Sequence, residues 1–564
     1  MTWGKRRALV ILIVICVLIL IVLAATLSNR IPANSVLVLD VNGAIQEQRP
    51  QSWLNAVAGG WIPTQHDFTD AIDTARFDRR IVGLVVRVGP LESEWAKLEE
   101  IRQRILEFRK SGKPSICYLE ADGTGNPEYY VASACQQVWL VPTAPVAVRG
   151  MMAAVTFLRG TLDKLKIVPD FYHIGDFKTA TNELTEKKFT PAHREEDNAM
   201  LQSIYNQYLN EASESRGMAR ADFENLVKQG PFESGDALKN KLVDRLAYWD
   251  QLQEFFRDRH DGWNPVDLGQ YRIRIRNRGA ATVAVIHATG LIVSGESDTT
   301  PNGDFIMGGD SVSEDIRRAR EDSNVKAIIL RIDSGGGSAV ASEVIRREVE
   351  LAKKEKPVVV SMSDVAASGG YWIAMDADKI VAEPDTITGS IGVLIGKMNL
   401  SGLYGLLGLS TDYISTADNA TMYWDQQNFT PAQQQAIQKS MQQTYASFIA
   451  GVAAGRHMTV EAVDKIGKGR VWTGAQAKQI GLIDDIGGFD RALADAKQLA
   501  HIPANEPVTI ERWPKEKGLL EQLFEHDGDE SARTQLKGIQ AILRFAGFSS
   551  EPIQARLPFN LNIR

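Results

Sequence analysis

Cysteine and histidine are scarce in this chain, whose 564 residues include three cysteines and eight histidines. The two residue types form no cluster with metal-ligand spacing, so we expect no metal. The net charge is −7 and lysine and arginine form no basic stripe, which argues against nucleic acid as a partner. The glycine run 335–337 is not followed by the lysine and hydroxyl residue of a P-loop, and we expect no cofactor.

The few cysteines carry little information about function. Cys16 lies within an apolar run, while Cys117 and Cys135 lie in the first half of the chain and have no counterparts in the second half. Two interpretations of that pair remain open. They are two small buried residues, which is the interpretation we favour, or they form a disulfide, which an exported location would permit.

Charge is absent from one long stretch, residues 8–27, which is long enough at ~1.5 Å per residue to cross a ~30 Å hydrocarbon core. Basic residues occupy positions 5–7 before it, and only Arg30 follows closely, so the positive-inside rule leaves the N-terminus in the cytoplasm. A cleaved signal peptide is the alternative, but its apolar region is usually ~7–15 residues, and Leu23-Ala24-Ala25 is a poor cleavage site. We expect a cytoplasmic segment 1–7 and a transmembrane anchor 8–27.

The rest of the chain contains an internal repeat. Segments of the first half recur in the same order about 240 residues later, and the matching pairs are 81–87 with 325–331, 113–114 with 356–357, 129–132 with 371–374, 189–192 with 429–432, and 235–244 with 474–484. The first pair is apolar and rich in β-branched residues, as in buried strands of a parallel sheet, and segments with helical spacing follow it. With 44% hydrophobic residues, the chain can bury two cores. The sequence therefore predicts two α/β domains of one ancestry.

The repeat also defines expected domain boundaries. The two copies cover about 35–250 and 281–500, and a linker rich in arginine, aspartate and glycine lies at 251–280. A tail at 501–564 lies outside the repeat. Helical spacing at Leu536, Ile539, Leu543 and Ala546 indicates a helix in this tail. Three roles remain open for this helix: it covers its own domain, touches the membrane surface or packs against a neighbouring subunit. We favour the first of these three.

One lysine and one serine occupy different copies of the repeat. Lys178 lies in the run Gly-Asp-Phe-Lys-Thr-Ala of the first copy, and Ser368 lies in Ala-Ser-Gly-Gly-Tyr-Trp of the second. A serine hydroxyl needs a base to become a nucleophile, and a desolvated lysine amine can be that base. We expect Asp176 to point away, because a carboxylate facing the amine would favour its charged form. The place of Ser368 falls on Gly125 or Asn126 in the first copy, and that of Lys178 near Asn419 in the second. A complete pair must therefore span both domains.

Ser368 precedes an expected helix, whose N-terminal amides can stabilise a developing negative charge. The N–H of Gly369 is one candidate oxyanion donor, and the loop 335–337 could supply a second because glycine lets the backbone approach a substrate closely. The alternative for both glycine segments is tight packing of a helix against a sheet.

Together these residues resemble the signal peptide peptidase A (protease IV) family in its long, two-copy bacterial form. The motifs that carry the resemblance are residues 175–180, Asp333-Ser334-Gly335-Gly336-Gly337-Ser338, residues 366–372, Thr388-Gly389-Ser390-Ile391-Gly392-Val393 and Val471-Trp472-Thr473-Gly474. The resemblance implies two tandem ClpP/crotonase-like domains and a membrane-bound serine endopeptidase with a Ser/Lys dyad. It implies that Ser368 is the nucleophile, Lys178 the general base and Ser390 the partner that positions the lysine. By the same resemblance, Gly369 donates to the oxyanion, with Gly336 and Gly337 lining the site.

The resemblance also implies partners and a location. Family members degrade cleaved signal peptides and other extended apolar peptides as homotetramers anchored in the bacterial inner membrane, with the catalytic domains in the periplasm. One departure is visible, because Gly335 stands where the family usually has proline. Two other classes remain as alternatives: an acyl-CoA enzyme of crotonase-like fold, which gives the anchor and Lys178 no role, and a catalytically silent membrane scaffold.

Overall fold

A computed structural model describes residues 31–49, 61–120, 124–260, 262–272, 279–300, 303–515, 554–556 and 562–563. The predicted cytoplasmic segment and anchor, residues 1–27, lie outside the described residues. Within the described part of the chain, no helix has both the length and the apolar character needed to cross a membrane.

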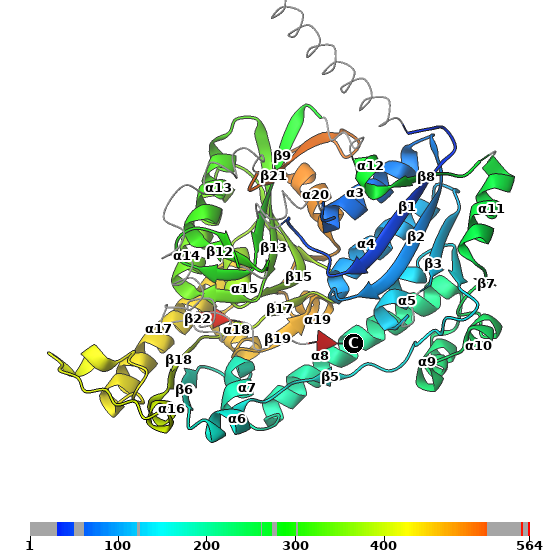
Figure 1. The fold of residues 1–564 in the computed structure, drawn as a ribbon. Helices are drawn as coiled ribbons and strands as arrows, with labels where there is room; N and C mark the ends of the chain where they lie inside the picture. Colours follow the sequence, from blue (N-terminus) through cyan, green and yellow to red (C-terminus); the bar gives the residue numbers. More distant parts are fainter. Residues whose placement is uncertain are drawn as a thin grey trace, which may run out of the picture.

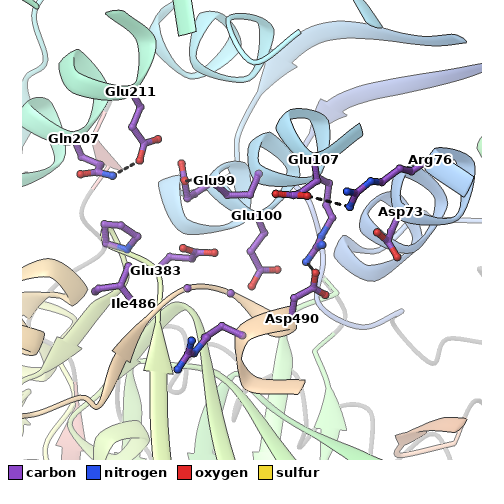
Figure 2. Close-up of a pocket in the computed structure, with 16 residues that line it drawn as sticks. Asp73, Arg76, Glu99, Glu100, Glu107, Gln207, Glu211, Glu383, Ile486 and Asp490 are labelled. Atoms are coloured by element: carbon purple, nitrogen blue, oxygen red, sulfur yellow. Dashed lines mark hydrogen bonds and ion pairs between the residues drawn. The ribbon is translucent and has the colours of Figure 1, made fainter. Parts of the chain in front are cut away.

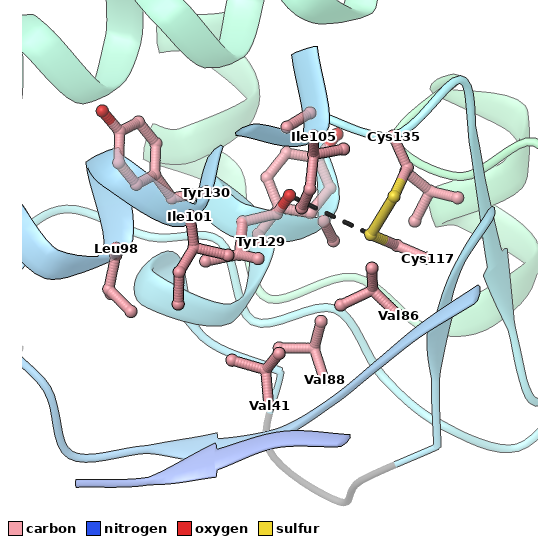
Figure 3. Packing of buried hydrophobic residues seen from close by; sticks show 14 of the residues in the cluster. Val41, Val86, Val88, Leu98, Ile101, Ile105, Cys117, Tyr129, Tyr130 and Cys135 are labelled. Carbon is pink, nitrogen blue, oxygen red and sulfur yellow. Dashed lines mark hydrogen bonds between the residues drawn. A yellow bond between two sulfur atoms is a disulfide. The ribbon is translucent and has the colours of Figure 1, made fainter. Parts of the chain in front are cut away.

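The first repeat is built on a six-stranded parallel sheet of order β7-β4-β3-β2-β1-β8 (Figure 1). Its strands are β1 (Ser35–Gly43), β2 (Ile81–Leu91), β3 (Ser115–Leu119), β4 (Gln137–Leu140), β7 (Arg245–Leu246) and β8 (Asn264–Asp267). Its helices are α3 (Gln65–Phe77), α4 (Trp95–Arg109), α5 (Asn126–Ala132), α6 (Arg159–Lys164), α7 (Asn182–Thr185), α8 (Pro191–Arg216), α9 (Arg220–Gln229), α10 (Ser234–Lys239), α11 (Trp249–His260) and α12 (Leu268–Arg272). Figure 3 shows how Val86 and Val88 of β2 pack with Ile101 and Ile105 of α4 in the core.

The second repeat has a similar plan. Its sheet follows the order β19-β17-β15-β13-β9-β21, in which all pairs are parallel except β17 with β19, and a branch from β15 through β16 to β20 is also parallel. Its strands are β9 (Ala281–Thr289), β13 (Val325–Ser334), β15 (Val358–Ala367), β17 (Ile387–Gly389), β19 (Val471–Thr473) and β21 (Val508–Trp513), with β16 (Lys379–Ala382) between β15 and β20 (Asp485–Ile486). Its helices are α13 (Gly309–Glu321), α14 (Ala339–Lys353), α15 (Gly369–Ala374), α16 (Ser401–Leu406), α17 (Pro431–Gly455), α18 (Val460–Ile466), α19 (Gly474–Gln479) and α20 (Phe489–Leu499). The predicted buried strands 81–87 and 325–331 lie within β2 and β13, so the predicted α/β repeat is confirmed.

The repeated Thr-Pro motif begins the longest helix of each copy. Thr190 accepts a hydrogen bond from the His193 amide at the start of α8, and Thr430 accepts one from the Gln433 amide at the start of α17. Proline follows at the first helical position, where its missing N–H costs no hydrogen bond.

A third sheet joins the two copies. It has the order β11-β12-β10-β14-β22-β18-β6 and contains β6 (Val168–His173) from the first copy and β18 (Leu394–Asn399) from the second, paired antiparallel over six residues. Its other strands are β10 (Leu291–Val293), β11 (Asp298–Thr299), β12 (Phe305–Gly308), β14 (Gly336–Ser338) and β22 (Gln554–Arg556). The strand β23 (Asn562–Ile563) pairs separately with β5 (Ala153–Ala154).

Buried ion pairs also cross between the copies. Arg331 of β13 bonds Glu47 at 2.8 Å and Glu100 of α4 at 2.7 Å. Lys97 of α4 bonds Asp333 at 2.7 Å and Asp364 at 2.9 Å. These pairs connect β13 and β15 of the second copy to Glu47 and α4 of the first copy.

The structure differs from the expected boundaries at two places. The expected linker 251–280 contains β8, which pairs with β1, and most of α11, whose Leu252 and Phe256 are buried. The expected tail contains β21, which pairs with β9. Each sheet takes its edge strand from the segment that follows the repeat, and such short strands lack the apolar run by which buried strands are recognised. The expected tail helix at 536–546 lies outside the described residues.

Of the two interpretations of Cys117 and Cys135, the structure shows the disulfide rather than the favoured pair of thiols. Cys117 lies in β3 and Cys135 follows α5, and their Cα atoms are 5.7 Å apart (Figure 3). That separation is within the usual range for a disulfide. Both residues are buried, so the bond lies inside the core of the first copy.

Candidate active site

Lys178 and Ser368 meet within one chain. The Nζ of Lys178 lies 2.7 Å from the Oγ of Ser368 and 3.0 Å from both the Oγ and the backbone oxygen of Ser390. All three side chains are fully buried. The lysine comes from the first copy and both serines come from the second, so the site lies at the junction of the two copies.

The pairing of β6 with β18 brings the lysine to the serines. Lys178 follows β6 and precedes the short 3₁₀ helix η1 (Thr179–Thr181), and Ser390 precedes β18 by four residues. A loop before β19 completes the junction: the amide of Phe177 donates to the oxygen of Lys468 at 3.1 Å, and that of Ser390 to the oxygen of Arg470 at 2.7 Å.

Gly469 in that loop is required by close packing. Its φ is +83°, and a Cβ placed on it would lie 2.4 Å from the backbone nitrogen of Lys178. Only glycine fits such a position without displacing the lysine. Sequence reasoning missed this residue, although the Gly-Lys-Gly run at 467–469 is a visible signal of a tight turn.

Burial lowers the pKa of Lys178 to about 7, against an ordinary value of 10.5, because the charged amine is out of water. The carboxyl of Glu196 on α8 opposes this shift. Burial also raises the pKa of Glu196 well above its usual range, which weakens its negative charge near neutrality. Asp176 is exposed at the surface, whereas Lys178 is buried, as expected of a carboxylate that points away.

Glu196 is a second residue that sequence reasoning missed. It accepts hydrogen bonds from the Val471 amide at 2.8 Å and from the Thr179 hydroxyl at 3.3 Å. It therefore connects the residue after Lys178 to the strand β19 of the second copy. A glutamate in the second turn of a long helix has no sequence signal that separates it from a solvated one.

Ser368 stands at a sharp turn between β15 and α15. Its φ of 56° and ψ of −113° are sparsely populated for a residue with a side chain. Its amide donates to the oxygen of Gly389 at 2.8 Å, and its oxygen accepts from the Trp372 amide at 2.8 Å. These bonds hold the turn so that the hydroxyl faces the amine of Lys178.

The amide of Gly369 is the first of α15 and has no acceptor within the helix. A Cβ on Gly369 would lie 3.1 Å from both the Cα of Gly336 and the nitrogen of Gly337, so the glycine loop touches the helix start. The amide of Gly336 donates to the hydroxyl of Ser334 at 3.1 Å, whereas Gly337 brings its nitrogen next to Gly369. Of the two loop amides, that of Gly337 is therefore the better placed to act with the Gly369 amide as an oxyanion donor.

The position that matches Ser368 in the first copy and the position that matches Lys178 in the second copy have no catalytic side chain. Gly125 precedes α5 where Ser368 precedes α15, and the side chain of Asn126 accepts from the Arg149 amide at 2.9 Å. Asn419 lies in the exposed 3₁₀ helix η2 (Asp418–Thr421). Each copy thus contributes one half of a single site.

A polar pocket of ≈ 570 Å³ lies elsewhere on the junction of the copies. Figure 2 shows Glu99 and Glu100 of α4 on one side of it and Glu383 and Asp490 of the second copy on the other. None of the six predicted site residues lines this pocket. Most of the side chains that line it are charged or polar, unlike those of a cleft for apolar peptides. Among the described residues, no group of three or more histidine, cysteine or acidic side chains has the geometry of a metal site.

The chain is similar to known proteases. The model of peptidase family S49 matches residues 107–261 and 350–503, one region in each copy. The chloroplastic serine protease SPPA of Arabidopsis thaliana is 35% identical over 86% of this chain and 72% of that protein. Protease 4 of Salmonella typhi is 34% identical over 83% of this chain and 79% of that protein. Among solved structures, ClpP1 from Listeria monocytogenes aligns at 15% identity over 36% of this chain and 91% of that chain, with a TM-score of 0.23. The chain belongs to peptidase family S49 and is a serine peptidase.

Proposed function

We propose that this protein is a serine endopeptidase in which Ser368 is the nucleophile and Lys178 the general base. The observation that carries the proposal is the 2.7 Å contact between the lysine Nζ and the serine Oγ, in a site where burial lowers the pKa of Lys178 to about 7. A neutral amine at that distance can accept the hydroxyl proton near neutral pH. Ser390 holds the amine in line through its own hydroxyl and carbonyl oxygens.

The reaction follows from these contacts. Lys178 takes the proton of Ser368, whose Oγ forms a bond to the carbonyl carbon of the peptide. The amides of Gly369 and Gly337 donate to the resulting oxyanion. The lysine returns the proton to the leaving nitrogen as the C–N bond breaks. Water, deprotonated by the same lysine, then attacks the acyl-enzyme, and the lysine returns that proton to Ser368 as the acid leaves.

We propose cleaved signal peptides and other extended apolar peptides as the substrates, on the periplasmic side of the inner membrane, with residues 8–27 as the anchor. The similarity to protease 4 supports this substrate class. The disulfide between Cys117 and Cys135 supports an oxidising compartment. We also propose a homotetramer. An apolar segment on the surface supports self-association, since Leu407, Leu409 and Ile414 are more than half exposed.

The two alternative classes fit less well. A catalytically silent scaffold would gain nothing from a buried lysine in contact with a serine on a strained turn. Both features destabilise the fold. An acyl-CoA enzyme needs neither residue.

Labelling with a peptidyl phosphonate tests the proposal. We expect one label per chain on Ser368, in the wild type and in a Ser213→Ala control, whose buried serine lies on α8 away from the site. The Ser368→Ala variant should not react, and Lys178→Ala should react far more slowly. The double variant should be no worse than either single variant, because the two residues act as a unit. Substantial peptide hydrolysis by folded Ser368→Ala protein would overturn the assignment.

A further inference from the structure

One buried carboxyl near the base has no part in the proposed reaction. Glu196 lies in the second turn of α8, a helix of the first copy that packs against β19 of the second copy (Figure 1). The residue is only 1% exposed. Burial of a carboxyl group is costly unless hydrogen bonds replace those lost to water. The reason for an acid at this position therefore lies in its contacts.

Glu196 links segments of the two copies. One of its carboxyl oxygens accepts from the Val471 amide at 2.8 Å, and the other accepts from the Thr179 hydroxyl at 3.3 Å. Thr179 directly follows Lys178, and Val471 begins β19. Both partners are buried, so water does not compete for these bonds. The carboxyl thus joins the segment that carries the base to the second copy.

The strip 468–471, which ends at β19, contacts the base from two directions. Its first carbonyl oxygen accepts from the Phe177 amide at 3.1 Å, and its third accepts from the Ser390 amide at 2.7 Å. A shift of the strip would move the residue before Lys178 and also the serine that bonds its amine. Because Glu196 accepts the amide at the end of this strip, it limits such a shift.

We propose that Glu196 is a positioning residue for the general base, because it fixes the strip 468–471 and the segment around Lys178 to each other. The inference rests on the proposed function, in which Lys178 takes the proton of Ser368. Glu196 acts through the lysine and exchanges no proton with the substrate. Its role differs from that of Ser390, whose hydroxyl contacts the amine itself.

The charge of Glu196 provides a second way to detect this role. Burial lowers the pKa of Lys178 to about 7, and the carboxyl of Glu196 opposes that shift. Asp197 on the same helix raises the pKa of Glu196, and Arg470 in the strip lowers it. An ionised carboxyl favours the charged amine, so loss of the carboxyl should lower the pKa of Lys178 further.

Three substitutions separate position from charge. Glu196→Gln removes the charge but keeps both contacts, because its carbonyl oxygen can accept from the Val471 amide and its NH₂ group can donate to the Thr179 hydroxyl. Glu196→Ala removes the charge and both contacts, and Thr179→Val removes one contact. Glu195→Ala is the matched control, since this neighbour is exposed and its ion pair with Arg470 at 2.8 Å is of the surface kind that contributes little.

The measurement is the rate at which a peptidyl phosphonate labels Ser368, from pH 5 to 9. Glu196→Gln should keep the plateau rate within about twofold and reach half of it at a pH about half a unit lower or more. Glu196→Ala should lower the plateau about tenfold or more, because a base displaced by ~1 Å can cost ~10²-fold. Thr179→Val should cause a smaller loss, which tests the role even if Glu196→Ala fails to fold. Glu195→Ala should match the wild type.

The outcomes distinguish this inference from the proposed chemistry. A wild type that is not labelled on Ser368 would refute the proposed function, and the inference with it. If the wild type is labelled, a wild-type plateau in folded Glu196→Ala or in Thr179→Val would overturn the positioning role alone. The same holds for a Glu196→Gln plateau as low as that of Glu196→Ala, and for a Glu196→Gln profile with an unmoved midpoint, which would leave Glu196 a purely structural contact.

Discussion

The pH dependence of kcat/KM is the sharpest consequence of the buried lysine. With a pKa of about 7, Lys178 is about one-tenth neutral at pH 6 and about nine-tenths neutral at pH 8. With the ordinary value of 10.5, only about 3 amines in 10⁴ would be neutral at pH 7. Burial thus increases the fraction of active base on the order of 10³-fold at neutral pH. Since the base is active without its proton, kcat/KM should rise with pH through about 7 and then level.

The assay is a pH series of kcat/KM from pH 5 to 9 with a fluorogenic peptide, at constant ionic strength. Asp176→Asn is the control: its carboxylate is exposed, so the profile should not move. Ser390→Ala should lower the plateau by ~10²-fold, because one oriented contact to the amine is lost, without abolishing the pH dependence. A wild-type profile that is flat from pH 5 to 9, or that still rises about tenfold per pH unit up to pH 9 without levelling, would refute Lys178 as a base tuned by burial.

Three further results are expected. Gly469→Ala should reduce kcat at least tenfold, because its Cβ would lie 2.4 Å from the backbone nitrogen of Lys178. Gly481→Ala is the control: its φ of +80° is similar, but no atom lies within 4 Å of the added Cβ, so kcat should not fall. Equal losses of kcat in the two variants would contradict a packing role for Gly469. Lys178→Met should be more stable than the wild type in urea, because the pKa of the lysine in the folded protein lies below its unfolded value of 10.5. The difference in free energy of unfolding between variant and wild type should grow from pH 10 to pH 7, where it reaches a few kcal/mol. An equal difference at the two pH values would contradict burial of the amine as the cause. Arg331→Met should lower the free energy of unfolding by about 3–5 kcal/mol, since Glu47 loses its buried partner, and a loss under 1 kcal/mol in urea unfolding would refute that role.

Several features of the fold could be predicted from sequence because their causes are local. The apolar runs of β2 and β13, the Thr-Pro helix starts and the glycines after Ser368 each depend on a few neighbouring residues. Repetition made the first two of these signals stronger, since the strand runs and the Thr-Pro helix starts each appear twice in the same order. The edge strands β8 and β21 could not be predicted in this way, because a short strand at a sheet edge has no distinctive pattern.

The two cysteines show the same limit. Their sequence positions are compatible with either thiols or a disulfide, and only the packing of α5 on β3 brings their Cα atoms to 5.7 Å. Gly469 and Glu196 were missed for a related reason. Their importance comes from what they touch in the other copy. The Gly-Lys-Gly run around Gly469 signals a turn but not its contact with Lys178, and nothing near Glu196 in the sequence distinguishes that glutamate.

The sequence by itself determined which residues could do the chemistry: a serine before a helix in one copy, a lysine in the other, and no second candidate of either kind at the matching places. The tertiary structure alone decided that these residues, 190 positions apart, meet at 2.7 Å. It also decided that burial removes the amine of Lys178 from water, which lowers its pKa to about 7. The structure likewise placed a tail strand between β14 and β18. The physical reason is that residue type and periodicity are local properties, whereas desolvation and contact depend on how the two copies pack against each other.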